Sequence, residues 1–226
     1  MTITYYGHSC FLLETSGKRL LFDPYIRPNE LAKHIDVAAI KPDYVLISHG
    51  HFDHIEDAIS ILQESGATAV CAWEIMVWLN KQGIEKVHPM NVGGKWVFDF
   101  GTVKCTAAQH SSGMPDGTYG GNPMGFIVQN SEGTFYYSGD TALTMDMKLI
   151  GEQFNLDIAL LPLGDNFTMG IDDAVIAADF IKCNNILGVH YDTFGFIKID
   201  HDAAKATFAK AGKKLTLLGI GEVLTV

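Results

Sequence analysis

The run His49-Gly50-His51-Phe52-Asp53-His54 places three imidazoles and one carboxylate within six residues. It follows Tyr44–Ser48, an apolar run of strand length, and it precedes apolar residues at helical spacing that predict a helix over His54–Ser65. The run therefore lies where a buried strand turns into a helix. Polar groups without partners are costly at such a place, and a bound metal ion is the simplest partner for them.

Four ligands so close in sequence do not suit a single ion, because the turn directs alternate side chains to different sides. We expect His49 and His51 to serve one metal ion, and Asp53 and His54 to serve a second. Catalytic zinc sites have three protein ligands and keep a position for water, so each ion needs ligands from later in the chain. The residues available for this, each at the end of a predicted strand, are His110, Asp140 and His190.

Strand-like and helix-like segments follow one another in two similar halves, each with β-rich runs first and helices later. The expected strands are Thr2–Tyr6, Cys10–Thr15, Lys18–Asp23, Tyr44–Ser48, Ala67–Ala72, Lys95–Phe100, Thr102–Gln109, Met124–Gln129, Thr134–Ser138, Ile158–Leu161, Ile186–Val189, Leu215–Leu218 and Glu222–Val226. The expected helices are His54–Ser65, Trp73–Gln82, Leu143–Phe154, Asp172–Cys183 and Asp200–Lys210. The pattern indicates one α+β domain over residues 1–226, with two sheets face to face and helices outside. The glycine-rich stretch 113–123 has no periodicity, which favours a functional loop.

The net charge of −10, with Arg19 and Arg27 as the only arginines, argues against nucleic acid as a partner and favours a small-molecule substrate. The four cysteines are scattered in apolar stretches and are expected to be reduced core residues. The sequence begins without a basic, then apolar, leader, and no apolar run approaches the roughly 20 residues that cross a bilayer. A cytoplasmic protein without a membrane partner is therefore expected.

The order His-x-His-x-Asp-His, followed by a single His, a single Asp and a single His, resembles the metal-ligand signature of the metallo-β-lactamase superfamily. Shorter motifs resemble a branch of small predicted metal-dependent hydrolases related to ascorbate-6-phosphate lactonase. These motifs are Gly7-His8-Ser9, Phe22-Asp23-Pro24, Asp165–Gly170 and His190–Phe194. The resemblance covers the whole chain. It implies a four-layer αββα sandwich of two mixed sheets, with helices on the outer faces and the site at one sheet edge.

The resemblance also implies how the ligands are divided between two divalent ions. Zinc is the expected metal, and Mn, Fe or Ni would also suit these donors. The implied sets are His49, His51 and His110 for one ion, Asp53, His54 and His190 for the other, and Asp140 as a bridge. The implied activity is hydrolysis of a small lactone, ester or phosphoester by a hydroxide held between the ions, with Asp53 orienting that hydroxide.

Several residues near these motifs have two interpretations. His8 either contacts the substrate or a ligand, which would make it catalytic together with Asp53, or it caps backbone in a loop. Asp23 either holds a ligating imidazole or belongs to turn chemistry beside Pro24. The roles of Asp165 and Thr193 stay open at this point.

Two other functions compete with small-molecule hydrolysis. A nuclease of the same superfamily would carry an inserted domain or a basic arm, and the sequence has no Lys/Arg cluster. A non-hydrolytic di-metal redox protein would have an acid near the second cluster ligand and an electron-transfer domain, whereas this sequence has His51 and shows no such domain. The sequence does not fix the oligomeric state, and a homo-oligomer is compatible with it.

Overall fold

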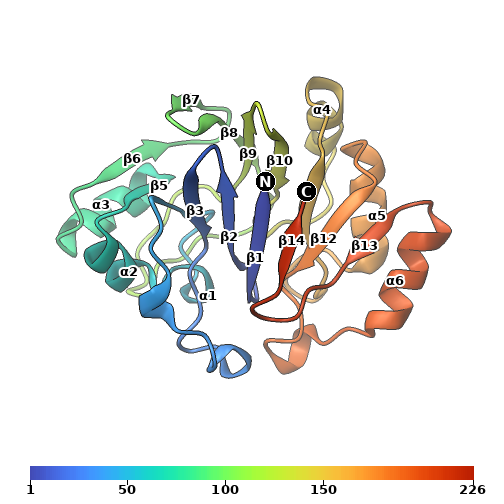
Figure 1. Cartoon of the computed structure of the whole chain (residues 1–226), viewed down its shortest axis with the longest axis horizontal. Coiled ribbons are helices and arrows are strands. Elements are labelled where there is room, and N and C mark those ends of the chain that lie inside the picture. Colours follow the sequence, from blue (N-terminus) through green and yellow to red (C-terminus); the bar gives the residue numbers. More distant parts are fainter.

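Two seven-stranded sheets form the centre of the computed structural model, which describes residues 1–226 (Figure 1). The strand orders are β14-β1-β2-β3-β4-β5-β6 and β13-β12-β11-β10-β9-β8-β7. In each sheet the strands pair antiparallel in one half and parallel in the other, so both sheets are mixed. This arrangement confirms the two similar halves that the sequence predicted.

The strands of the first sheet are β1 (Thr2–Gly7), β2 (Cys10–Thr15), β3 (Lys18–Phe22), β4 (Tyr44–Leu46), β5 (Thr68–Ala72), β6 (Val87–Met90) and β14 (Val223–Thr225). Those of the second are β7 (Lys95–Phe98), β8 (Gly101–Ala107), β9 (Met124–Asn130), β10 (Gly133–Tyr137), β11 (Ile158–Pro162), β12 (Asn185–Val189) and β13 (Lys214–Thr216). The last strand pairs with the first, which brings the two chain ends together in Figure 1.

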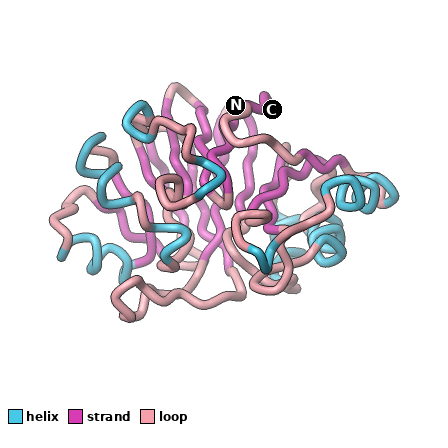
Figure 2. The backbone as a smooth tube through the Cα atoms, turned by 90° about the horizontal axis from the view of Figure 1, so that it is seen from below, coloured by secondary structure: helices cyan, strands magenta, loops and turns pink.

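Helices lie outside the strands on both sides of the molecule, as Figure 2 shows. The α-helices are α1 (Phe52–Ile55), α2 (Ala58–Ser65), α3 (Trp73–Lys81), α4 (Asp146–Gln153), α5 (Ile171–Phe180) and α6 (His201–Lys210). Three short 3-10 helices are η1 (Glu30–Ala32), η2 (Val37–Ala39) and η3 (Gly195–Ile197). Helices α4, α5 and α6 pack on the second sheet through small and aromatic side chains such as Ala177 and Phe208. The four-layer αββα sandwich is thereby confirmed.

Apolar side chains of both sheets meet in one central core. Phe11 of β2 stacks on Phe22 of β3 with ring centroids 4.5 Å apart, and the edge of Tyr137 from the other sheet meets Phe11 at 5.1 Å. Phe135 also reaches Phe11, at 5.7 Å. These aromatic contacts hold the two sheets face to face because each ring buries a large apolar area.

Two predicted features differ from the structure. The helix expected over His54–Ser65 is broken into α1 and α2, because the carboxylate of Asp57 accepts hydrogen bonds from the backbone N–H groups of Ile26 and Arg27 at the junction. Strand β6 was not expected, since His88 and Pro89 interrupt its apolar pattern. Proline is tolerated there because β6 is an edge strand.

The helices are all short, and none combines the length and the apolar character that a membrane crossing requires. The four cysteines are buried and unpaired, as expected from the sequence.

The aromatic core predicts a large difference between buried and exposed positions. Phe11→Ala should lower the free energy of unfolding by about 3–5 kcal/mol, because it removes a fully buried ring and leaves a cavity. Val97→Ala, at a side chain that is 70% exposed on β7, should change it by about 0.5 kcal/mol or less. Urea denaturation of the two variants beside the parent protein measures both values. Equal losses would show that the two sheets do not depend on this contact.

Candidate metal centre

Six strands that run in the same direction end at one edge of the sandwich. Strands β1, β3 and β4 belong to the first sheet, and β8, β10 and β12 belong to the second. Polar residues follow each of these ends. They are His8, Asp23, His49, His110, Asp140 and His190. The topology thus brings together side chains that are up to 182 positions apart in the sequence, from His8 to His190.

The turn from β4 into α1 is tightly packed. A Cβ atom at Gly50 would overlap the sulfur of Met114, so a larger residue between the first two histidines would displace this buried side chain. The backbone N–H of Gly50 donates to Ser112 Oγ at 3.0 Å, which fixes the turn against the glycine-rich segment. His51 then serves as the N-cap of α1. Met114 of the glycine-rich stretch 113–123 and the preceding Ser112 therefore pack against the histidine turn.

One group of donor atoms consists of His49, His51 and His110, whose ligand atoms lie within 4.8 Å of one another. His49 Nε2 faces His51 Nδ1 at 2.9 Å. The other nitrogen of each ring has a separate partner, because His49 Nδ1 contacts Ser48 Oγ at 2.9 Å and His51 Nε2 contacts Ser111 Oγ at 3.1 Å. With protons on those outer nitrogens, the inner nitrogens present lone pairs to a common point.

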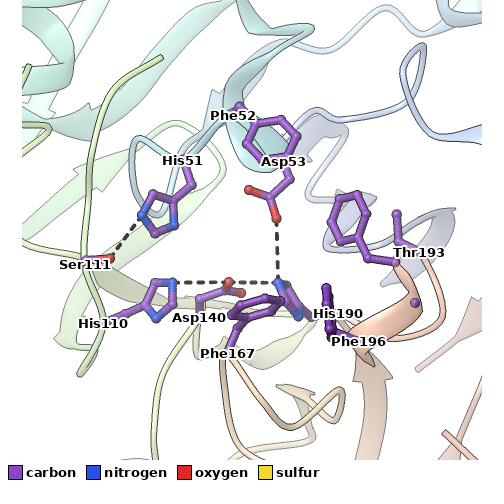
Figure 3. Close-up of a pocket in the computed structure, with 12 residues that line it drawn as sticks. His51, Phe52, Asp53, His110, Ser111, Asp140, Phe167, His190, Thr193 and Phe196 are labelled. Atoms are coloured by element: carbon purple, nitrogen blue, oxygen red, sulfur yellow. Dashed lines mark hydrogen bonds and ion pairs between the residues drawn. The ribbon is translucent and has the colours of Figure 1, made fainter. Parts of the chain in front are cut away.

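A second group consists of His8, Asp53, His54 and His190, again with ligand atoms within 4.8 Å of one another. Asp53 Oδ2 lies 3.8 Å from His190 Nε2 and 3.9 Å from His54 Nε2. His8 Nε2 contacts the same oxygen at 3.0 Å. Figure 3 shows Asp53 and His190 facing each other across the cavity.

Asp140 lies between the two groups. Its Oδ2 atom is 3.0 Å from His190 Nε2 and 3.3 Å from His54 Nε2 on one side. On the other side it is 3.6 Å from His110 Nε2 and 4.0 Å from His49 Nε2. Figure 3 shows Asp140 between His110 and His190. One carboxylate is therefore within reach of both groups of donors.

The buried carboxylate of Asp23 accepts four hydrogen bonds from residues around the candidate ligands. Its Oδ2 accepts hydrogen bonds from Ser48 Oγ at 2.5 Å, Tyr137 OH at 2.6 Å and His54 Nδ1 at 2.8 Å. Its Oδ1 accepts a fourth from the Ser48 N–H at 2.7 Å. Because Ser48 Oγ gives its proton to Asp23, it accepts the proton of His49 Nδ1. Asp23 thus orients His54 directly and His49 through Ser48, and this contact agrees with the interpretation of Asp23 as an acid that holds an imidazole.

Burial keeps most of the imidazoles neutral. It lowers the pKa of His49 well below its usual range and lowers those of His51 and His110 as well. Burial, together with the neighbouring His190, lowers the pKa of His8 to about 4. Neutral imidazole is the form that binds metal, so these rings are prepared for a cation at neutral pH.

His54 and Asp140 form the charged pair of the site. Burial opposes charge on His54, but Asp140 and Asp23 together raise its pKa well above the usual range. Burial equally opposes charge on Asp140, while His190 and His54 hold its pKa well below the usual range. Burial also opposes charge on Asp53, but His54 and the hydrogen bond from His8 together lower its pKa. Both carboxylates are therefore ionised and attract positive charge.

His8 is oriented from behind by Thr193. His8 Nδ1 lies 3.0 Å from Thr193 Oγ1, and a hydroxyl proton donated there leaves Nε2–H to donate to Asp53 Oδ2. Neutral His8 then satisfies both contacts. His8 contacts a candidate ligand through its side chain, which is the first of the two interpretations given above, and Thr193 gains a defined position in the site.

Residues with a strained backbone conformation cluster at the same edge of the sandwich. Eight residues other than glycine have positive φ, a conformation that costs energy in L-residues and that structures tend to retain at functional sites. Six of the eight lie in the loops that carry the candidate site residues or that line the cavity. These six are His8, Asp23, Asp165, Asn166, His190 and Asp192.

The donor set fits a metal centre. His54 Nε2, Asp140 Oδ1 and His190 Nδ1 are buried and have no hydrogen-bond partner, although buried polar atoms are nearly always paired. Of these atoms, His54 Nε2 is the one that faces the other donors, since it lies 3.3 Å from Asp140 Oδ2 and 3.9 Å from Asp53 Oδ2. Imidazole nitrogens and carboxylate oxygens, with no cysteine among them, suit zinc and related divalent ions.

All seven residues that the sequence predicted as ligands lie together at this edge. The sequence did not reveal the residues that position them, Ser48, Ser111 and Tyr137. Ser48 carried a weak signal as the one polar residue at the end of an apolar run. Ser111 and Tyr137 carried none, because their contacts depend on the packing of one sheet on the other.

Comparison with known proteins places these observations in a family. The family model described as "Beta-lactamase superfamily domain" matches residues 2–190. A "UPF0173 metal-dependent hydrolase" of Methylacidiphilum infernorum is 52% identical over 224 residues and covers 99% of each chain. A protein of the same description from Christiangramia forsetii is 52% identical over 223 residues and covers 98% of each chain.

Among solved structures, Igni18, described as a novel metallo hydrolase from the hyperthermophilic archaeon Ignicoccus hospitalis, superposes with a TM-score of 0.90. It is 34% identical, and the match covers 100% of this chain and 97% of that one. The resemblance to the metallo-β-lactamase superfamily is thereby confirmed. This chain belongs to the beta-lactamase superfamily and, within it, to the UPF0173 family of metal-dependent hydrolases.

Proposed function

We propose that the protein is a dinuclear metal-dependent hydrolase of a small lactone, ester or phosphoester. The observation that carries the proposal is the position of Asp140, whose Oδ2 lies within 4.0 Å of Nε2 atoms from two separate groups of ligands. A carboxylate between two groups of neutral and acidic donors suits a pair of divalent ions about 3.5–4 Å apart.

The ligands would divide as the two groups of donor atoms suggest. His49, His51 and His110 would hold one ion. Asp53, His54 and His190 would hold the other, with Asp140 shared. When bound, such ions activate water at neutral pH and polarise the oxygen of the bond under attack. Zinc is the expected metal because these donors and this geometry suit it.

The chain's own groups would manage the proton. Asp53 Oδ2 faces the cavity and is ionised, so it accepts a proton from the attacking water and returns it to the leaving oxygen. His8 donates a hydrogen bond to Asp53 Oδ2 and keeps that carboxylate oriented. Thr193 in turn holds the tautomer of His8. No serine or cysteine nucleophile is needed.

A nuclease function is less compatible with the surface around the site. No lysine or arginine lines the cavity above the ligands. The two arginines are engaged elsewhere, since Arg19 binds the Lys41 carbonyl and Arg27 binds Asp57. Binding of a nucleic-acid backbone depends on such cations.

The first prediction concerns metal content. Protein loaded with excess zinc or manganese and then desalted should retain about two ions per chain, because the donor groups exceed the needs of one ion. Asp140→Ala should lower this value to about one or less, whereas Asp146→Ala, at an exposed acid on α4, should leave it unchanged. Elemental analysis measures all three proteins, and an absorption spectrum distinguishes colourless zinc from iron. A plateau at one ion in the parent protein would refute the dinuclear proposal.

The second prediction concerns the carboxylate of Asp23. Asp23→Asn should weaken metal binding by about 10–100-fold, because an amide cannot accept all of the protons that orient His54 and Ser48. Competition with a chelator measures the affinity, and circular dichroism verifies that the variant is folded. Asp146→Asn is the matched control. Unchanged affinity in a folded Asp23→Asn protein would mean that the ligands are positioned without this contact.

The third prediction concerns proton transfer. Asp53→Asn should retain part of the metal but lower kcat by about 10²-fold or more, with little change in KM, because the lost charge acts mainly in the transition state. Glu56→Gln, an exposed acid three positions further along the chain, should retain activity. A panel of lactones, aryl esters and phosphodiesters supplies the assay. Near-normal kcat in metal-loaded Asp53→Asn would assign Asp53 a structural role only.

A further inference from the structure

The cavity above the ligands has an aromatic wall. It has a volume of about 760 Å³, and its lining includes Phe52, Phe167, Phe194 and Phe196 beside the candidate ligands. Phe52 and Phe167 are 51% and 52% exposed, and Phe196 is 78% exposed. Single exposed apolar residues are ordinary, but several that share one cavity indicate a binding surface.

The rings come from three separate segments and converge. Phe52 begins α1, Phe167 lies in the loop between β11 and α5, and Phe194 and Phe196 lie around η3. The rings of Phe52 and Phe194 are 6.2 Å apart, and those of Phe167 and Phe196 are 6.4 Å apart. Tyr25 supports Phe52 from behind in an edge contact at 5.8 Å. Figure 3 shows Phe52, Phe167 and Phe196 around the opening that leads to Asp53 and His190.

The loops that carry these rings adopt a costly backbone. Asp165 and Asn166 have φ of 58° and 49° directly before Phe167, and Asp192 has φ of 62° two residues before Phe194. Left-handed conformations of residues other than glycine persist where the surrounding structure holds them in place. The aromatic side chains are thus presented in defined positions.

The side chains that line the cavity offer a negatively charged substrate only histidines and the hydroxyl groups of Ser111 and Thr193. Its charged lining residues, apart from histidines, are Asp53 and Asp140, and no lysine or arginine reaches it. A second cavity of about 420 Å³ has uncharged polar lining such as Ser112, Thr118 and Asn122. His110 and Ser111 line both cavities, so the two adjoin at these residues.

We propose that the substrate is a neutral ester or lactone with an apolar, ring-bearing group that binds against Phe52, Phe167, Phe194 and Phe196. This inference rests on the proposed function and narrows it, since it disfavours phosphoesters that carry negative charge. The reacting carbonyl would lie at the ligands, and the polar part of the molecule would extend past His110 into the second cavity.

Binding of two metal-chelating probes tests the inference without turnover. Benzohydroxamate and acetohydroxamate share the chelating group and differ in a phenyl ring against a methyl group. Metal-loaded wild-type protein should bind benzohydroxamate at least about 10-fold more tightly, because the ring is buried against the aromatic wall. Phe167→Ala/Phe196→Ala should lose most of this preference and keep its affinity for acetohydroxamate. Titration calorimetry measures the four affinities.

Trp96→Ala is the matched control, since Trp96 is 53% exposed on β7 and does not line the cavity. It should retain the full preference. Benzohydroxamate with a carboxylate at the 4-position should bind no better than acetohydroxamate, because that charge would face the aromatic wall.

Three results would overturn the inference. One is equal affinity of wild-type protein for the phenyl and methyl probes while it hydrolyses esters, which would leave the proposed function intact. Another is an unchanged phenyl preference in the folded double variant, which would show that Phe167 and Phe196 do not bind the ring of the probe. The third is a lack of binding of either probe by protein with full metal content, which would contradict the proposed catalytic centre as well.

Discussion

Four imidazole Nε2 atoms lie within 4.0 Å of one carboxylate oxygen of Asp140, at a depth where water does not screen charge. One carboxylate offsets one positive charge, so the remaining imidazoles stay neutral and their lone pairs need a cation. The sandwich satisfies this requirement from both sheets at once, because three strands of each end at this edge. The centre is therefore complete only when the two sheets pack against each other.

Asp23 explains how such a cluster persists in a packed protein. It joins the end of β3, the turn after β4, helix α1 and strand β10 of the opposite sheet through four hydrogen bonds. Two of these bonds orient ligand rings, since Asp23 contacts His54 Nδ1 directly and His49 Nδ1 through Ser48 Oγ. The bonds from the Ser48 N–H and the Tyr137 hydroxyl anchor the carboxylate itself. The strained residues His8 and His190 are held by backbone contacts such as the one from the His190 N–H to the His8 carbonyl.

The sequence predicted the structure well where a pattern of residues has one simple physical explanation. Clustered histidines after a buried strand predicted residues that lie together at one edge, and alternating strand and helix periods predicted both sheets. It was less informative where a contact overrides local preference. The break between α1 and α2 depends on Asp57 binding the backbone near Arg27, and β6 is a strand despite Pro89 because it lies at an edge. The aromatic wall has no pattern in the sequence, since its rings come from three separate segments that only the fold brings together.

The central claim is that two ions occupy this edge with Asp140 between them, and anomalous diffraction from zinc-loaded crystals tests it most directly. The account predicts two peaks about 3.5–4 Å apart, one beside His49, His51 and His110 and one beside Asp53, His54 and His190. The Asp140 carboxylate should lie between the peaks. A single peak at full zinc occupancy, or a peak among the nitrogens and oxygens of Asp23, His49 and His54, would contradict it.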